Sequence, residues 1–167
     1  MFKRKDFTVI TIEVLTRLDN SSHEGILISK NKQWLYFWKV VDFQIDGRIL
    51  VRRSKVFSYG QHKMSKFQYR AMKTLGEFDK INFKSEVQLP ESDKKMLKKI
   101  ANKTSAVIST EINDQIGDIK KIGNDRITFQ EYTPKGKTRF GQRAYIEDIF
   151  MLHINAEKAL TYSLFSK

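Results

Sequence analysis

The sequence predicts a mainly β protein of the α+β class, in which two tandem small β barrels are joined by a midsection that contains helices. The first observation is a high density of short strand-like segments separated by turn residues, which is typical of small barrels. The second is a repeated pattern, because the pairs Asn31/Asn124 and Val56/Ile149 are both separated by 93 residues. We expect a first barrel over residues 1–60, a helix-strand-helix connection over 61–103 and a second barrel over 104–167.

The first barrel is expected to contain four or five antiparallel strands. Thr, Val and Ile alternate through residues 7–18, which predicts an opening strand, and residues 19–22 supply turn chemistry. The segments expected next are a strand from Gly25 to Ile28, a turn at Asn31-Lys32, an aromatic run from Trp34 to Trp38, a tight turn at Asp46-Gly47 and a return over residues 48–53 toward Val56. Closure into a barrel would remove exposed strand edges.

The second barrel is expected to repeat this arrangement. Its expected strands cover residues 104–112, 117–122, 125–132 and 137–146, with turns at Asn124-Asp125 and at Thr133-Pro134-Lys135-Gly136. Residues 156–164 fit either a terminal helix or a closing strand, and the sequence leaves both open.

Alternation along the aromatic run places Trp34 and Tyr36 on one face and Leu35 and Phe37 on the other. Trp34 and Tyr36 align with Ile127 and Phe129 of the second copy, so we expect them in the core. Leu35 and Phe37 would then cover another surface, which could be the other unit, a helix or a partner.

The period of the apolar residues changes in the midsection. Residues 62–75 predict an amphipathic helix that ends at Gly76, and its apolar stripe is Met64, Phe67, Ala71, Met72 and Leu75. Strict alternation over residues 81–89 predicts a strand, and a second helix starts after Pro90 with the stripe Met96, Leu97, Ile100 and Ala101. We expect the two barrels to pack on each other through these helices.

The composition bounds the class of protein. A chain of 167 residues with 40% hydrophobic content can bury a core, and the absence of cysteine excludes a disulfide framework and thiolate zinc sites. No apolar run approaches the roughly 20 residues that span a membrane. We therefore expect a cytoplasmic protein that does not contact membranes.

The charge is unevenly distributed along the chain. Residues 1–104 hold 22 basic and 11 acidic side chains, whereas residues 105–167 hold 9 and 8. This difference concentrates the net charge of +12 in the first unit and the midsection. Such a field attracts polyanions, of which nucleic acid is the commonest, although a solubilising lysine-rich surface explains the same composition.

The sequence carries no recognisable catalytic or metal-binding motif. His23, His62 and His153 are isolated from one another, and no phosphate loop, nucleophile elbow or dinucleotide-binding glycine pattern occurs. Gly136 and Gly141 are explained as turn and bulge positions. We therefore expect a protein that is not an enzyme and that holds no cofactor or metal.

The positions of turn glycines and apolar residues resemble a family of uncharacterised bacterial proteins built from two tandem small β barrels of the Sm-like or SH3-like type. The residues that carry the resemblance are Asp42–Gly47, Arg52, Val56, Phe67, Leu75 and Gly76 in the first half, and Gly117, Ile119, Ile122, Gly136, Asp148-Ile149 and Tyr162 in the second. The resemblance implies a fold and no catalytic residues. An Asp-Ile pair commonly closes the meander in such proteins, and the first copy has Lys55-Val56 in its place.

Basic residues interleaved with aromatic residues form the best candidate site. Small barrels bind single-stranded nucleic acid by stacking bases on aromatic rings while basic side chains hold phosphates. The candidates for binding RNA or single-stranded DNA are Phe37, Trp38, Arg48, Arg52, Arg53 and Lys55 in the first unit, and Lys95 and Lys99 on the second helix.

A protein-interaction module is the alternative function, for example an immunity or adaptor protein that uses the apolar face formed by Leu35 and Phe37. A small-molecule sensor with its ligand between the two units ranks third.

Overall fold

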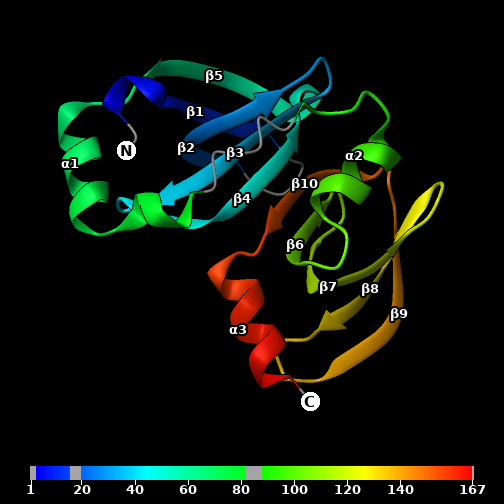
Figure 1. The fold of residues 1–167 in the computed structure, drawn as a ribbon. Helices are drawn as coiled ribbons and strands as arrows, with labels where there is room; N and C mark the ends of the chain where they lie inside the picture. Colours follow the sequence, from blue (N-terminus) through cyan, green and yellow to red (C-terminus); the bar gives the residue numbers. More distant parts are fainter. Residues whose placement is uncertain (1–2, 16–19, 82–87, 167) are drawn as a thin grey trace.

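The computed structural model describes residues 3–15, 20–81 and 88–166, which form a mainly β fold (Figure 1). The strands are β1 (Thr8–Leu15), β2 (Asn20–Lys30), β3 (Trp34–Val41), β4 (Gln44–Arg52), β5 (Val56–Lys63), β6 (Ser105–Thr110), β7 (Asp114–Ile122), β8 (Arg126–Tyr132), β9 (Thr138–Tyr145) and β10 (Ile149–Ile154). The helices are α1 (Lys66–Thr74), α2 (Asp93–Ile100) and α3 (Glu157–Phe165), with short 3-10 turns η1 (Arg4–Asp6), η2 (Arg53–Lys55) and η3 (Glu77–Lys80). The prediction of a mainly β protein is confirmed.

All ten strands belong to one antiparallel sheet in which the same strand order occurs twice. The order is β5-β1-β2-β3-β4 followed by β10-β6-β7-β8-β9. We call β1–β5 the first repeat and β6–β10 the second repeat, since in each the fifth strand lies beside the first and the others follow as hairpins. The described sheet is open, with β5 and β9 at its edges, so strand pairing closes neither expected barrel.

The two repeats are joined by direct pairing of β4 with β10, visible in Figure 1 where the two strands lie side by side. The register runs from Met151 opposite Val51 to Ile154 opposite Arg48. Helices therefore do not form the main joint, contrary to the expectation from the sequence. The backbone groups along the edge of β4 are satisfied by a strand of the other repeat.

Register shifts and glycine contacts that occur in both repeats align the two repeats more accurately than sequence similarity does. The β2/β3 pairing shifts register after Leu27, and the β7/β8 pairing shifts after Ile119, 92 residues later. A Cβ added at Gly25 would lie 2.4 Å from Cδ2 of Phe37, and one added at Gly117 would lie 3.0 Å from Cδ2 of Phe129. In β2 and β3 the offset is therefore 92, and Phe37 corresponds to Phe129.

The alignment of Trp34 with Ile127, made from the sequence, is wrong by one position. Leu35 is the structural equivalent of Ile127, because Lys30 pairs with Leu35 as Ile122 pairs with Ile127. The expected offset of 93 holds in the fifth strands, where β5 and β10 shift register at equivalent positions.

The tight turn of the first repeat lies at Asp42-Phe43, four residues before the expected Asp46-Gly47. Both residues have positive φ, 48° and 65°, as a two-residue hairpin of type I′ requires. Gly47 instead lies within β4, where its φ of 69° accompanies a register shift in the β3/β4 pairing. An added Cβ at Gly47 would come within 2.4 Å of the Ile154 carbonyl oxygen across the joint.

The opening turn was also misplaced. Residues 20–22, which were expected in a turn, are the first residues of β2, and residues 16–19 lie outside the described part of the chain. The expected turns at Asn31-Lys32, at Asn124-Asp125 and at Thr133–Gly136 are confirmed by the strand boundaries.

Strand β3 is buried on both faces. Trp34 and Tyr36 pack with Leu50 and with apolar residues of the second repeat and α2. Leu35 and Phe37 pack on the opposite side, among apolar residues of β1 and β4. The prediction that Trp34 and Tyr36 belong to the core is confirmed, and the Leu35/Phe37 face is covered by the chain itself.

Helix α2 buries the stripe that its sequence predicts, because Met96, Leu97, Ile100 and the adjacent Ala101 all lie in the largest core cluster. Helix α1 buries Met72, and Met64 lies buried before it, but Phe67 and Leu75 are 68% and 50% exposed, so these two residues of the predicted apolar stripe do not belong to the core. The αL conformation of Gly76 ends this segment as expected.

The C-terminal segment is a helix, α3, which resolves the choice left open by the sequence. It lies beside β6 and β7 (Figure 1). Of the strand expected over 81–89, residues 82–87 are outside the described part of the chain, while the flanking Ile81 and Leu89 are buried.

Candidate functional site

The apolar face expected to bind a base or a protein partner is not accessible. Leu35 is 2% exposed and Phe37 is 0% exposed. Both side chains contact the cluster that includes Ile49, Val51 and Phe150. The assignment of Phe37 as a stacking platform is therefore wrong, as is that of Leu35 and Phe37 as a protein interface. The physical reason is that Ile10, Ile12 and Val14 of β1, together with Phe150 of β10, pack on this side of β3.

Trp38 and Arg48 interact with each other across the β3/β4 hairpin. The Arg48 guanidinium lies 5.5 Å from the centre of the Trp38 ring and donates a hydrogen bond of 2.9 Å to the Tyr36 hydroxyl. Burial raises the pKa of Tyr36, and the adjacent Arg48 opposes that shift. Trp38 also packs partly against the cluster of Phe7, so this pair is engaged within the first repeat.

Arg52 joins the two repeats and is not free to hold a phosphate. Its guanidinium donates to the carbonyl oxygens of Ile149 and Ile146 at 2.7 and 2.8 Å, and it forms a 2.9 Å ion pair with Asp93. The same group lies 4.2 Å from the centre of the Trp34 ring, and the Trp34 indole donates to Asp93 at 2.8 Å. Arg52 therefore has a structural role, which corrects its assignment to a nucleic-acid site.

The neighbouring basic residues of the first repeat also have partners. Arg53 is exposed and donates a 3.2 Å hydrogen bond to the carbonyl oxygen of Asn31. Lys55 forms an ion pair with Glu111 of the second repeat. The six candidates in the first repeat therefore do not form a common basic surface with free side chains.

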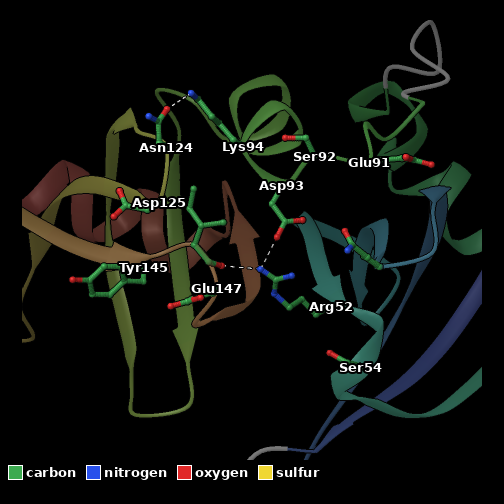
Figure 2. Close-up of a pocket in the computed structure, with 12 residues that line it drawn as sticks. Arg52, Ser54, Glu91, Ser92, Asp93, Lys94, Asn124, Asp125, Tyr145 and Glu147 are labelled. Atoms are coloured by element: carbon green, nitrogen blue, oxygen red, sulfur yellow. Dashed lines mark hydrogen bonds and ion pairs between the residues drawn. The ribbon is translucent and has the colours of Figure 1, made fainter.

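Around Arg52 lies a cleft of about 770 Å³ between the repeats (Figure 2). Equivalent turns of both repeats line it, namely the turns before β3 and β8 and the segments after β4 and β9, together with the start of α2. The lining residues are Gln33, Arg52, Ser54, Glu91, Ser92, Asp93, Lys94, Asn124, Asp125, Tyr145, Ile146 and Glu147.

Ion pairs neutralise part of the acidic charge of this cleft. Asp93 is paired with Arg52, and Asp125 is paired with Arg126 at 2.8 Å. Hydrogen bonds from Arg126 hold the pKa of Asp125 below its ordinary value. The Arg126 guanidinium also lies 5.2 Å from the centre of the half-exposed Tyr145 ring. The cleft thus offers polar groups and one accessible aromatic ring, and no strong positive field.

Basic side chains gather instead on α2 and on the adjoining part of β7. We call this surface the lysine ridge, and it consists of Lys95, Lys98 and Lys99 on α2, Lys103 after it, and Lys120 and Lys121 on β7. All six residues are exposed. The two parts adjoin because the Ile119 amide donates to the Thr104 carbonyl oxygen at 2.8 Å. The ridge includes the two candidates that the sequence placed on this helix, Lys95 and Lys99.

The ridge holds charges with few internal partners. Lys99 donates a 3.3 Å hydrogen bond to the Gln88 carbonyl oxygen, and Lys120 forms a 3.2 Å ion pair with Asp118. Among the described residues, no ion pair involves Lys95 or Lys98. Lys94 lies between the ridge and the cleft, where its ammonium donates to the Asn124 side chain (Figure 2).

A second titratable cluster lies at the far end of the β4/β10 joint. The His153 ring donates to the Asp46 carbonyl oxygen, and its Nε2 lies 3.5 Å from the Asp46 carboxylate. His23 lies near it, and burial, followed by the charge of Lys39, lowers the pKa of His23 to about 4. Burial also lowers the pKa of His153. Over the described residues, no group of three or more His, Asp or Glu side chains is arranged to hold a metal ion.

Sequence reasoning missed most of the cleft. A helix was expected to start after Pro90, but neither Asp93 in its first turn nor Tyr145 was singled out as a site residue. The similar turns at Asn31 and Asn124 were the available signal, since both turns contribute to the same side of the molecule. What could not be read from the sequence was that β4/β10 pairing brings these turns together.

No protein-family model, curated protein or solved structure matches the chain. None of the helices in the described part of the chain is both long and apolar enough to cross a bilayer.

Proposed function

We propose that this chain is a non-enzymatic binding protein, built from two tandem small β units of the Sm-like or SH3-like type, that binds single-stranded nucleic acid along the lysine ridge. The observation that carries the proposal is the concentration of six exposed lysines on α2, just after it and on the adjoining part of β7. The absence of cysteine agrees with a reducing compartment, so the proposal includes a cytoplasmic location.

The geometry of α2 favours a polyanion over an acidic protein patch of fixed shape. The helix buries Met96, Leu97 and Ile100, so its lysines are held on the outer face by core packing. Lysine ammonium groups are point charges on flexible stems that accommodate a mobile phosphate backbone. Their contacts release counterions from the nucleic acid, and this release drives binding without sequence specificity.

Bases would contact the cleft next to the ridge. Tyr145 is 50% exposed there and presents a ring on which a base can stack. Gln33 and Asn124, which also line the cleft, carry amide groups that can bond to base edges. A single strand can follow this path because its bases are unpaired, whereas a duplex keeps its bases stacked inside.

Charge reversal on α2 tests the proposal. The triple variant Lys95→Glu/Lys98→Glu/Lys99→Glu is expected to weaken binding of a labelled 15-nucleotide RNA by at least about tenfold at low salt. Because each lost phosphate contact lowers the salt slope for a single strand by about 0.7, the plot of log K against log salt should flatten by about two. Fluorescence anisotropy over a salt series measures both quantities.

The matched control is the triple variant Lys66→Glu/Arg70→Glu/Lys73→Glu, which changes the same charge on the exposed face of α1. It should retain most of the affinity, because α1 lies at the far end of the first repeat (Figure 1). Equal losses in both variants would show that net charge alone governs binding, and absence of binding by the parent protein at low salt would refute the proposal.

A separate substitution tests the contribution of the cleft. Tyr145→Ala should weaken binding of the same RNA by roughly 1 to 3 kcal/mol, the range found when one stacking aromatic is removed, with an unchanged salt slope. Phe67→Ala, which removes a 68% exposed ring on the distant α1, is the control and should have no effect. An unchanged affinity for the Tyr145 variant would remove the cleft from the binding path.

A further inference from the structure

At the joint between the repeats, one side chain of the second repeat enters the core of the first repeat. Strand pairing alone does not require this contact. Phe150 of β10 lies at a register shift between Ile149 and Met151. Its side chain is 4% exposed and packs in the cluster formed by first-repeat residues, among them Val14 and Val51. A fifth strand of one repeat therefore places a bulged phenylalanine into the core of the other repeat.

The same residue type stands at the equivalent position of the first repeat, where its ring is exposed. The β1/β5 pairing also shifts register, between Ser58 and Val56, so that the skipped residue is Phe57, 93 positions before Phe150. Phe57 is 64% exposed, because β5 is an edge of the sheet. A large apolar side chain on a strand edge marks a site for pairing with another chain.

The opposite edge of the sheet offers a matching cavity. A cavity of about 350 Å³ adjoins β9, and its lining includes Thr110, Ala144 and Tyr145. Thr110 and Ala144 occupy the positions of Val14 and Val51, the first-repeat residues that pack with Phe150. The second repeat thus has an open space where the first repeat holds the inserted ring.

We propose that a second copy of this chain binds head to tail, with β5 of one copy pairing antiparallel with β9 of the next and Phe57 entering the cavity beside β9. This contact repeats the β4/β10 joint, in which a fourth strand pairs with a fifth strand. Transferring the internal register places Tyr59 opposite Arg143 and Gly60 opposite Gln142 of the neighbouring copy. Both edge strands have eight residues and no proline, so their backbone groups are available for pairing.

The contact is heterologous, because the two surfaces that meet are different. Copies added in this way form a closed ring if the rotation per copy closes and a filament if it does not. The proposal concerns the edges of the sheet and is independent of the lysine ridge, so its tests use nuclease-treated protein without nucleic acid.

Phe57→Asp is the first test. The parent protein should show concentration-dependent association in sedimentation velocity experiments, and the variant should raise the dissociation constant at least about 30-fold, as expected when a central anchor is lost. Phe67→Asp, on α1, is the matched control because that ring is 68% exposed and lies away from both edges. A monomer at all concentrations, or equal association by both variants, would overturn the proposal.

Cross-linking tests the register itself. The chain has no cysteine, so a Tyr59→Cys variant mixed with an Arg143→Cys variant can form only intermolecular disulfides. The expected result is a covalent heterodimer in high yield under mild oxidation. Tyr59→Cys mixed with Lys135→Cys, in the turn after β8, is the control. Equal yields in the two mixtures would contradict the predicted strand pairing.

Discussion

Replacing Arg52 by methionine is expected to lower the free energy of unfolding by about 2 to 4 kcal/mol. The substitution leaves the carbonyl oxygens of Ile146 and Ile149 without their donor and leaves Asp93 without its ion-pair partner. Since the Arg52 side chain is only 16% exposed, water replaces these interactions incompletely. The methionine side chain keeps part of the packing on Trp34, so the loss reports mainly on the polar contacts.

Arg53→Met is the control for this prediction. It removes a neighbouring guanidinium of the same charge that is exposed and donates one hydrogen bond, to Asn31. The expected loss is below about 1 kcal/mol, as for exposed polar contacts. Urea unfolding of the two variants measures both values. Similar losses of unfolding free energy in both variants would mean that Arg52 does not stabilise the joint between the repeats.

Acidification from pH 6.5 to about 4 is expected to destabilise the fold through His23. Burial lowers the pKa of this ring to about 4 from an ordinary value of 6.5. The unfolded chain therefore binds a proton that the folded chain excludes, so the contribution is fully present above pH 6.5 and is lost as the pH falls toward 4. The shift sets an upper limit of about 3 kcal/mol, and partial exposure of the ring brings the expected loss to about 2 kcal/mol.

Two positive groups near His23 also lower its pKa. Lys39 and His153 add unfavourable positive charge when the ring is protonated. Asp46 faces His153 and offsets part of the charge on that ring. His23→Gln should therefore flatten the dependence of unfolding free energy on pH between 4 and 6.5, measured by urea titration at several pH values. The exposed His62→Gln variant is the control, and a curve as steep in the His23 variant as in the control would contradict the assignment.

The two repeats carry opposite charges at one equivalent position. Lys55 of the first repeat corresponds to Asp148 of the second, at the same offset of 93 that relates Phe57 to Phe150. Lys55 pairs with Glu111 across the molecule. This reversal of charge agrees with the different positions of the two fifth strands, because β10 is internal to the sheet and β5 is an edge.

Local sequence patterns located most of the strands and helices. Alternation and turn residues placed β6, β7, β8 and β9 to within a few residues, and the 3.6-residue period identified the buried face of α2. Strand β10 was not expected. One error came where a residue type serves two backbone roles. Gly47 was interpreted as a turn residue because glycine permits positive φ, but the hairpin turn uses Asp42 and Phe43, and Gly47 lies in a bulge.

The candidate site was predicted less well than the fold. Lys95 and Lys99 are exposed on α2 as the helical period requires, since the buried stripe fixes the outer face. Phe37 and Arg52 were assigned to a surface, but Phe37 is buried and Arg52 is held by two carbonyl oxygens and a carboxylate. Alternation shows that two side chains lie on opposite faces of a strand, and it cannot show that both faces are covered.

The sequence by itself determined the duplicated pattern of short strands, the amphipathic helices and the excess of positive charge, because these depend on neighbouring residues and on composition. Only the tertiary structure decided that β4 pairs with β10, that Phe150 enters the first repeat and that the cleft lies between equivalent turns. Pairing between strands about 100 residues apart depends on the fit of two complete surfaces. The periodicity of apolar residues along one strand does not contain that information.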